Sequence, residues 1–283
     1  MQTHLLTRSW LCASAFTAHL ADKATGAGAD LALFDLEDSV PADRKAAARE
    51  ALRVRLRACP GLPTAVRINS LSSYDGVKDL LFLLDHELVP HVLLLPKTVL
   101  PNDVSLAAAL LAERQLAGVQ IYAIIETVSS LWSLRTMTSA PPGLAGLIFG
   151  AADFRADLGV PPTGTDLRFV QQDIALAARR FGLVAIDSPC FALEDPARLD
   201  VELAEAHALG FAGKIAIHPS QIAAINQRFT PSREAVDDAR RLVDASDRDP
   251  SCTIFRVDDE MVGPPFLKYA RHVLDSARQA RRR

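Results

Sequence analysis

Eight short apolar segments, each ending in or followed by polar residues, recur along the chain at intervals of about 22 to 37 residues. They are Ser9–Ser14, Leu31–Asp38, Pro63–Asn69, His91–Lys97, Gln120–Glu126, Gly146–Asp153, Leu183–Cys190 and Gly213–Pro219. Amphipathic stretches rich in Ala, Leu and Arg separate them, a pattern typical of parallel strands connected by helices. Eight such units in about 250 residues predict an α/β fold, a closed (β/α)8 TIM barrel with a C-terminal helical extension or lid.

The strand rhythm continues to about residue 219, and no linker rich in Gly, Ser or Pro interrupts it. We therefore expect residues 1–245 to form the barrel, which would be the catalytic domain. Residues 246–283 are expected to form a C-terminal lid and helix, because a polar break at 247–251 precedes a last amphipathic stretch.

Composition excludes several classes of partner. The 283 residues include 31 basic and 34 acidic ones, and this balance leaves no electrostatic footprint for nucleic acid. The four cysteines, Cys12, Cys59, Cys190 and Cys252, form no CxxC pair, so neither a zinc site nor a disulfide framework is expected. No signal peptide and no apolar run long enough to span a bilayer is evident. We expect a cytoplasmic protein without a membrane partner.

A TIM barrel gathers its catalytic groups at the carboxyl ends of its strands. At these positions the sequence places a set of charged and polar side chains. The set comprises Asp35, Glu37, Asp38, Arg67, Asn69, Lys97, Glu126, Asp153 and His218. The predicted fold thus brings residues that are scattered in the sequence to one rim.

Glu126 and Asp153 are the candidate metal ligands. Each ends a strongly apolar predicted strand, where a carboxylate is costly unless it is paired or bound to a metal. With oxygen ligands and no Cys or His nearby, Mg²⁺ is the natural ion, and it would leave positions for substrate oxygens. The alternative is that both are rim carboxylates held in salt bridges.

Arg67 and Asn69 share one side of the third predicted strand and are candidate substrate-binding residues. The arginine fork matches a carboxylate or a 2-oxo acid in a bidentate manner, although Arg67 could instead pair with Glu126 or Asp38. Arg8, Gly150 and Ala151 complete the expected substrate-binding set.

Asp35, Glu37 and Asp38 form an acidic run, which we expect to orient arginines and metal-bound water. Lys97 could bind a phosphate or a carboxylate, or pair with Glu126. The nearby acids argue against a Schiff-base role, since that role needs a desolvated lysine. Together with Arg67, the residues Glu37, Asp38 and Lys97 are the candidate catalytic residues.

Six short runs of the sequence occur in a fixed order. They are Phe34–Val40, Arg67–Asn69, Leu95–Lys97, Ile125–Thr127, Phe149–Asp153 and Gly213–Ile222. Together they closely resemble the HpcH/HpaI aldolase/citrate lyase superfamily, specifically its CitE-like (citrate lyase beta subunit-like) branch. The resemblance implies a TIM barrel, Mg²⁺ held by Glu126 and Asp153, and Arg67 at the oxo-acid end of the substrate. It also implies a coenzyme A thioester substrate and a homotrimer or homohexamer.

The chain departs from this pattern near its C-terminus. The resemblance implies an aspartate that transfers a proton to or from the thioester, within a Met-Ile/Val-Asp-x-Pro segment. Here Met261–Pro265 has Gly263 at that position, although Asp258, Asp259 and Glu260 lie just before it. Gln171 also stands where many relatives carry arginine. The metal and oxo-acid half of the site is thus intact, while the proton-transfer half has lost a group.

The function implied is that of a Mg²⁺-dependent carbon–carbon lyase. It would cleave a 3-hydroxy-3-carboxyacyl-CoA thioester, of the citryl-, citramalyl- or malyl-CoA type, into a 2-oxo acid and an acyl-CoA. Two alternatives remain open. One is a metal-dependent 2-oxo acid aldolase that acts without CoA or on a carrier-bound acyl group. The other is a non-catalytic protein that binds oxo acid or CoA and has lost turnover. The glycine at position 263 is the feature that suggests this second alternative.

Overall fold

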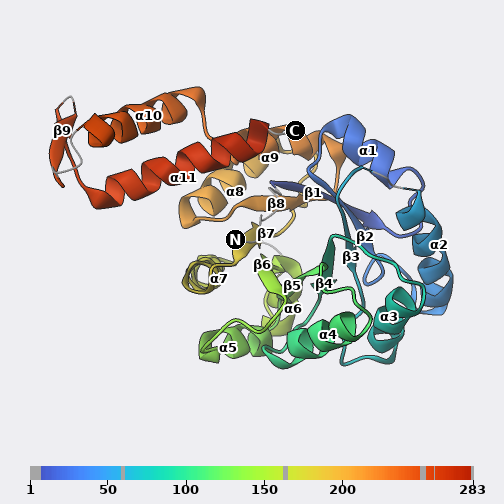
Figure 1. Ribbon diagram of the computed structural model, residues 1–283. Coiled ribbons are helices and arrows are strands. Elements are labelled where there is room, and N and C mark those ends of the chain that lie inside the picture. Colours follow the sequence, from blue (N-terminus) through green and yellow to red (C-terminus); the bar gives the residue numbers. More distant parts are fainter. Residues whose placement is uncertain (1–7, 59–60, 162–164, 249–252, 258, 282–283) are drawn as a thin grey trace. The chain divides into compact units, whose positions relative to one another are not determined.

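The computed structural model describes residues 8–58, 61–161, 165–248, 253–257 and 259–281 (Figure 1). Eight parallel strands close into a barrel in which each strand pairs with the next and β8 pairs with β1. The strands are β1 (Ser9–Ser14), β2 (Leu31–Asp35), β3 (Thr64–Arg67), β4 (Val92–Leu95), β5 (Gln120–Ile125), β6 (Leu144–Phe149), β7 (Val184–Asp187) and β8 (Gly213–Ala216). The predicted (β/α)8 barrel is confirmed.

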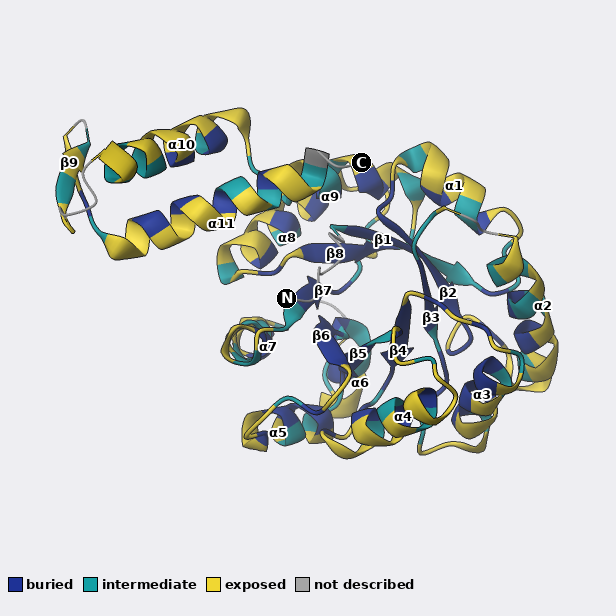
Figure 2. Cartoon of the chain, viewed as in Figure 1, coloured by how far each residue is buried: buried dark blue, intermediate teal, exposed yellow. Residues whose placement is uncertain are grey.

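Helices surround the barrel and bury one side against it while exposing the other (Figure 2). They are α1 (Leu20–Ala27), α2 (Lys45–Arg57), α3 (Tyr74–Asp85), α4 (Asn102–Glu113), α5 (Val128–Thr136), α6 (Ala151–Leu158), α7 (Arg168–Phe181), α8 (Pro196–Leu209) and α9 (Ile222–Arg228), with 3-10 turns at Ala42–Arg44 and Pro219–Gln221. In α7, Val170, Ile174 and Ala178 are buried, which is the spacing of one helix face.

One cluster of buried side chains draws residues from all eight strands and fills the barrel interior. Its members are Trp10, Leu31, Leu33, Ala65, Val92, Leu94, Tyr122, Ile124, Ala145, Ile148, Ile186 and Ile215. Alternate residues of a strand point to the same face. Asp35 continues the phase of Leu31 and Leu33, and Arg67 continues that of Ala65. The inner face of the barrel is therefore apolar through most of its height and charged at the carboxyl end.

The sixth strand is shorter than the sequence predicted. It ends at Phe149, and Asp153 lies in the first turn of α6 rather than at the end of a strand. The second strand likewise ends at Asp35, so that Glu37 and Asp38 belong to the loop that follows. Apolar residues continue past both strand ends, and the hydrophobic pattern alone does not locate the turn.

The chain divides into two compact units between Asn226 and Gln227. The second unit contains α10 (Arg233–Arg248), a hairpin of β9 (Phe255–Val257) and β10 (Glu260–Val262), and α11 (Pro264–Arg281). Val236 and Ala239 of α10 pack with Ala270, Val273 and Ala277 of α11. The expected boundary between residues 245 and 246 thus falls inside α10, because the apolar face of that helix is covered by α11.

None of the helices in the described ranges combines the length and the apolar composition that a membrane-spanning segment needs. Cys59, Cys252 and Asp258, named from the sequence, lie outside the described residues.

Candidate active site

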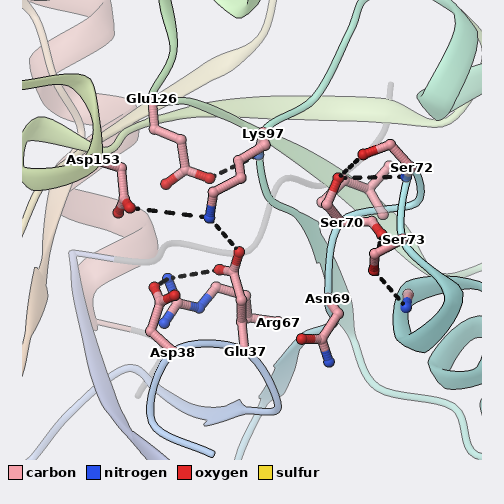
Figure 3. A network of polar contacts seen from close by, with 12 residues as sticks. Glu37, Asp38, Arg67, Asn69, Ser70, Ser72, Ser73, Lys97, Glu126 and Asp153 are labelled. Atoms are coloured by element: carbon pink, nitrogen blue, oxygen red, sulfur yellow. Dashed lines mark hydrogen bonds and ion pairs between the residues drawn. The ribbon is translucent and has the colours of Figure 1, made fainter. Parts of the chain in front are cut away.

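Charged side chains gather at the carboxyl ends of the strands, as Figure 3 shows. Glu37 and Arg67 come from the β2 and β3 ends, Lys97 and Glu126 from those of β4 and β5, and Asp153 from α6. The fold therefore brings five of the candidate residues together although 116 positions separate the first from the last.

Arg67 is held in place by Asp35. Its Nε donates to Asp35 Oδ1 at 2.6 Å and its Nη2 donates to Oδ2 at 2.8 Å, a bidentate, charge-assisted pair. The same carboxylate accepts the backbone N–H groups of Glu37 and Ser39, at 2.9 and 3.1 Å. Burial acts to raise the pKa of Asp35, but the hydrogen bonds from Arg67 outweigh it and lower that pKa. Asp35 orients the arginine, as expected.

The far end of the Arg67 guanidinium faces two acids. Its Nη1 lies 3.2 Å from Glu37 Oε2 and 3.3 Å from Asp38 Oδ2. Although Glu37 Oε2 is close to this charge, it is buried and accepts no well-oriented hydrogen bond from any described residue. Burial raises the pKa of Glu37. Because Asp35 occupies the Nε side of the fork, a ligand of Arg67 has only the Nη end to contact.

Lys97 lies between the acids. Its Nζ is 2.6 Å from Glu37 Oε1 and 3.9 Å from Asp153 Oδ1. Its backbone is in the left-handed region, at φ 49°, and its N–H donates to Glu126 Oε1 at 2.7 Å. Burial works against the charge of Lys97, but the hydrogen bond to Glu37 raises its pKa. The expected pairing of Lys97 with Glu126 thus runs through the backbone, and the ammonium group pairs with Glu37.

Glu126 directly follows β5 and is 1% exposed. Burial, together with the charges of Glu37 and Asp153, raises its pKa to about 8. Gly150 packs against it: a Cβ at position 150 would lie 2.4 Å from the Cβ of Glu126 and 2.7 Å from its Oε2. The glycine therefore makes room for this carboxyl group.

Glu126 and Asp153 are the two carboxylates that could hold a divalent cation here, and Figure 3 shows both pointing to the same side of Lys97. No group of three His, Cys, Asp or Glu side chains among the described residues encloses a metal position. Mg²⁺ commonly uses one or two carboxylates and completes its shell with water and substrate oxygens, so this donor set fits it. Burial and the neighbouring acids raise the pKa of Glu126 more than the charge of Lys97 lowers it, so this carboxyl group is not fully balanced by positive charge.

Asn69 does not join this cluster. Its Nδ2 donates to Asp79 Oδ2 at 2.6 Å and to the Leu36 carbonyl at 3.0 Å, while its Oδ1 accepts from Lys45 Nζ at 2.7 Å. Asn69 therefore ties the β3–α3 loop to the β2–α2 loop, and its expected substrate contact is corrected to this structural role.

Lys45 is a contributor that sequence reasoning missed. Its Nζ also donates to the carbonyls of Leu36 and Glu37, at 2.8 and 2.7 Å, and so holds the acidic loop in place. No motif marks it, because its role depends on a loop that the fold brings to the start of α2.

Arg8 lies at the opposite end of the barrel. It precedes β1, and its Nε and Nη2 donate to the two carboxylate oxygens of Asp30, which precedes β2. Parallel strands put both residues at the amino end, so the expected substrate contact of Arg8 is wrong. Ala151, by contrast, opens α6 at the carboxyl end, and no side chain caps that helix.

Comparison with known proteins places the chain in a family. Residues 8–219 match the family model described as HpcH/HpaI aldolase/citrate lyase. Residues 170–279 match a second model, described as a C–C bond lyase of the TIM-barrel fold.

Individual relatives agree with this match. A citrate lyase subunit beta-like protein of Deinococcus radiodurans is 35% identical over 95% of this chain and 96% of its own length. Human mitochondrial citramalyl-CoA lyase is 31% identical, with 88% of this chain and 78% of its own covered. The crystal structure of CitE from Mycobacterium tuberculosis, with magnesium, acetoacetate and coenzyme A, is 32% identical, covers 96% of this chain and 98% of its own, and has a TM-score of 0.77. The chain belongs to the HpcH/HpaI aldolase/citrate lyase family and is a carbon–carbon lyase built on a TIM barrel.

Proposed function

We propose that the protein cleaves a 3-hydroxy-3-carboxyacyl-CoA thioester, of the citryl-, citramalyl- or malyl-CoA type, into a 2-oxo acid and an acyl-CoA, with Mg²⁺ as cofactor. The observation that carries this proposal is the buried Glu126 beside Asp153, at the same rim as Arg67. Two relatives support the substrate class, since one is named as a citramalyl-CoA lyase and the other was crystallised with magnesium, acetoacetate and coenzyme A.

In this reaction, the bond between the hydroxyl-bearing carbon and the thioester α-carbon breaks. The hydroxyl group gives its proton to a base, either water or a neighbouring carboxylate, and becomes the ketone of the 2-oxo acid, while the electron pair of the broken bond stays on the acyl-CoA as an enolate. When bound to Glu126 and Asp153, Mg²⁺ supplies the positive charge that lowers the pKa of the hydroxyl group.

Arg67 contributes a second positive charge from its Nη end, directed at the oxo-acid portion of the substrate. Asp35 fixes the plane of that guanidinium through its two hydrogen bonds. Lys97 neutralises Glu37, so that the acidic loop does not repel the carboxylates of the substrate. In this proposal, Arg67 binds the oxo-acid portion of the substrate, Asp35 orients the Arg67 guanidinium, and Lys97 balances the charge of Glu37.

The enolate also needs a proton, and here the chain departs from its family. Gly263 cannot transfer one, because it has no side chain. We propose that water, a neighbouring acid or a partner subunit supplies the proton in a cytoplasmic homotrimer or homohexamer. The assembly is an expectation that rests on the resemblance, and the compartment is an expectation that rests on the composition.

The test is the release of a 2-oxo acid from citryl-, citramalyl- and malyl-CoA, each measured with Mg²⁺ and with excess chelator. We expect at least one thioester to release oxaloacetate, pyruvate or glyoxylate in a Mg²⁺-dependent manner. Binding of a thioester without release of a 2-oxo acid would favour the non-catalytic alternative, in which Gly263 marks the loss of the proton-transfer residue. Cleavage of free 2-oxo acid aldols, without any thioester turnover, would favour the CoA-independent aldolase.

A further inference from the structure

A cavity of about 540 Å³ lies outside the barrel wall, and its lining includes Ala151 at the start of α6, the helix that carries Asp153. Phe149, Asp187 and Lys214 line it. Each directly follows or precedes a residue of the inner cluster, so strand alternation turns them outward, toward the helices. The residues Gln171 of α7 and Val201 of α8 close the other side.

Most charges around this cavity are already paired. At its base, Lys214 Nζ is 2.6 Å from Asp187 Oδ2 and 3.2 Å from Glu202 Oε2. At its edge, ion pairs join Arg198 to Glu202 at 2.9 Å and Arg168 to Asp166 at 2.6 Å. Glu205, which is exposed, interacts electrostatically with Arg168 and Arg198. Neither the ion pairs at the base nor those at the edge leave Lys214, Arg198 or Arg168 free to bind an anionic ligand.

Arg155, on α6, is the exception. Among the described residues, its Nη1 and Nη2 donate only to the carbonyls of Ala151 and Thr165, both at 3.3 Å, and its buried Nε meets no acceptor. No carboxylate of the described residues forms an ion pair with it. Residues 162–164, next to Thr165, are Pro, Thr and Gly, so that segment supplies no acid either. Arg155 therefore lines this cavity with a positive charge that no described carboxylate pairs with.

We propose that this cavity is a second ligand site, which binds a small organic anion with an apolar body. Its apolar lining comprises Phe149, Leu167, Pro189, Phe191, Ala192 and Val201. The volume is in the range of small-molecule sites. The lining is mixed, since charged and polar side chains alternate with these apolar ones. A guanidinium group recognises carboxylate and phosphate alike, so the ligand carries one of these two groups against Arg155.

The experiment uses benzoate and phenyl phosphate as probes, titrated into the full chain and followed by ligand-observed NMR. At least one probe should bind, and Arg155→Gln should weaken it by about tenfold or more through loss of a charge-assisted contact. Arg168→Gln is the matched control, because Arg168 lines the same cavity but its charge is held by Asp166. That variant should bind within about twofold of wild type.

A second variant, Val201→Trp, fills the cavity from an exposed position and should also abolish binding. Arg67→Lys changes a residue of the proposed lyase centre. It should bind the probes as wild type does, which would show that the cavity is a separate site. The proposal is overturned by three results: neither probe binds up to about 10 mM, Arg155→Gln binds like wild type or loses no more than Arg168→Gln, or Arg67→Lys abolishes binding.

Discussion

The carboxyl group of Glu126 is buried beside two other acids, Glu37 and Asp153, and these neighbours and its burial raise its pKa to about 8. Sequence reasoning predicted this residue as a ligand, because a carboxylate directly after an apolar strand needs a partner. What the sequence could not supply is that Lys97 turns its ammonium group to Glu37 and offers Glu126 only a backbone N–H. The backbone of Lys97 is also in the left-handed region, which is uncommon for a residue other than glycine and is not marked in the sequence.

The raised pKa of Glu126 makes Mg²⁺ binding depend on pH. Below about pH 8 the group carries a proton that the ion must displace, so Mg²⁺ affinity should rise by about tenfold per pH unit up to that value and then level off. Calorimetry at pH 7 in buffers of different ionisation enthalpy should show release of about one proton per ion.

Glu126→Gln and Asp153→Asn serve as controls, and both should lose Mg²⁺ binding while keeping the far-ultraviolet circular dichroism of the barrel. Affinity equal to that of wild type in both variants would place the metal elsewhere. An affinity that is flat between pH 6 and pH 8 would show that Glu126 is already ionised.

Arg67→Lys tests the guanidinium. Lysine keeps the charge but loses both the bidentate pair with Asp35 and the Nη end, so transition-state binding should fall by about 2–4 kcal/mol. The readout is kcat/KM on the cleaved thioester. Arg53→Lys, on the surface of α2 and paired with Glu50, is a matched control expected to change nothing. Near-normal kcat/KM in Arg67→Lys would exclude the assigned role.

At the scale of the element, the eight strands were predictable and the loops at their ends were not. Apolar runs identify β5 and β6, but the turn that moves Asp153 onto α6 depends on Gly150 and on what it packs against. Arg8 was misplaced although it precedes the first predicted strand, because a residue before a parallel strand lies at the amino end of the barrel. Asn69 was placed at the correct end, but its partner Asp79 comes from a helix that the strand pattern does not locate.

The contact between β5 and the start of α6 can be tested with Gly150→Ala. The added Cβ would lie 2.4 Å from the Cβ of Glu126, so one of the two must shift, and stability should fall by about 1–3 kcal/mol together with Mg²⁺ affinity. Gly118→Ala is the control, because nothing lies within 4 Å of a Cβ there. Equal denaturant midpoints and equal affinities for the two variants would contradict the packing described.

At the scale of the whole molecule, the sequence predicted the first compact unit, the barrel, better than it predicted where the second unit begins. The barrel was predicted from its strand rhythm, whereas the boundary at 245 was wrong because the α10–α11 pairing depends on side-chain contacts between distant residues. The role of the second unit as a lid stays a prediction. Its Gly263 has no strained backbone, and a Cβ there would meet only Ile254 and Pro265, at 3.8 and 3.9 Å.

Because a Cβ fits at this position, Gly263→Asp tests the missing proton donor. A positioned acid or base contributes about 10²- to 10⁴-fold, so the variant should gain thioester turnover with unchanged affinity for pyruvate or oxaloacetate. The assay compares it with wild type on malyl-, citramalyl- and citryl-CoA. If wild type already turns over at about 1–10³ per second and the variant is only slower, another group donates the proton.

The central claim is that Glu126 and Asp153 form the metal centre, next to an oxo-acid position at Arg67. The most direct measurement is anomalous diffraction from crystals soaked with Mn²⁺, as a substitute for Mg²⁺, and pyruvate. The account predicts one strong peak bounded by the carboxylates of Glu126 and Asp153, with pyruvate between that peak and the Nη end of Arg67. A metal peak elsewhere, or pyruvate bound away from Arg67, would contradict it.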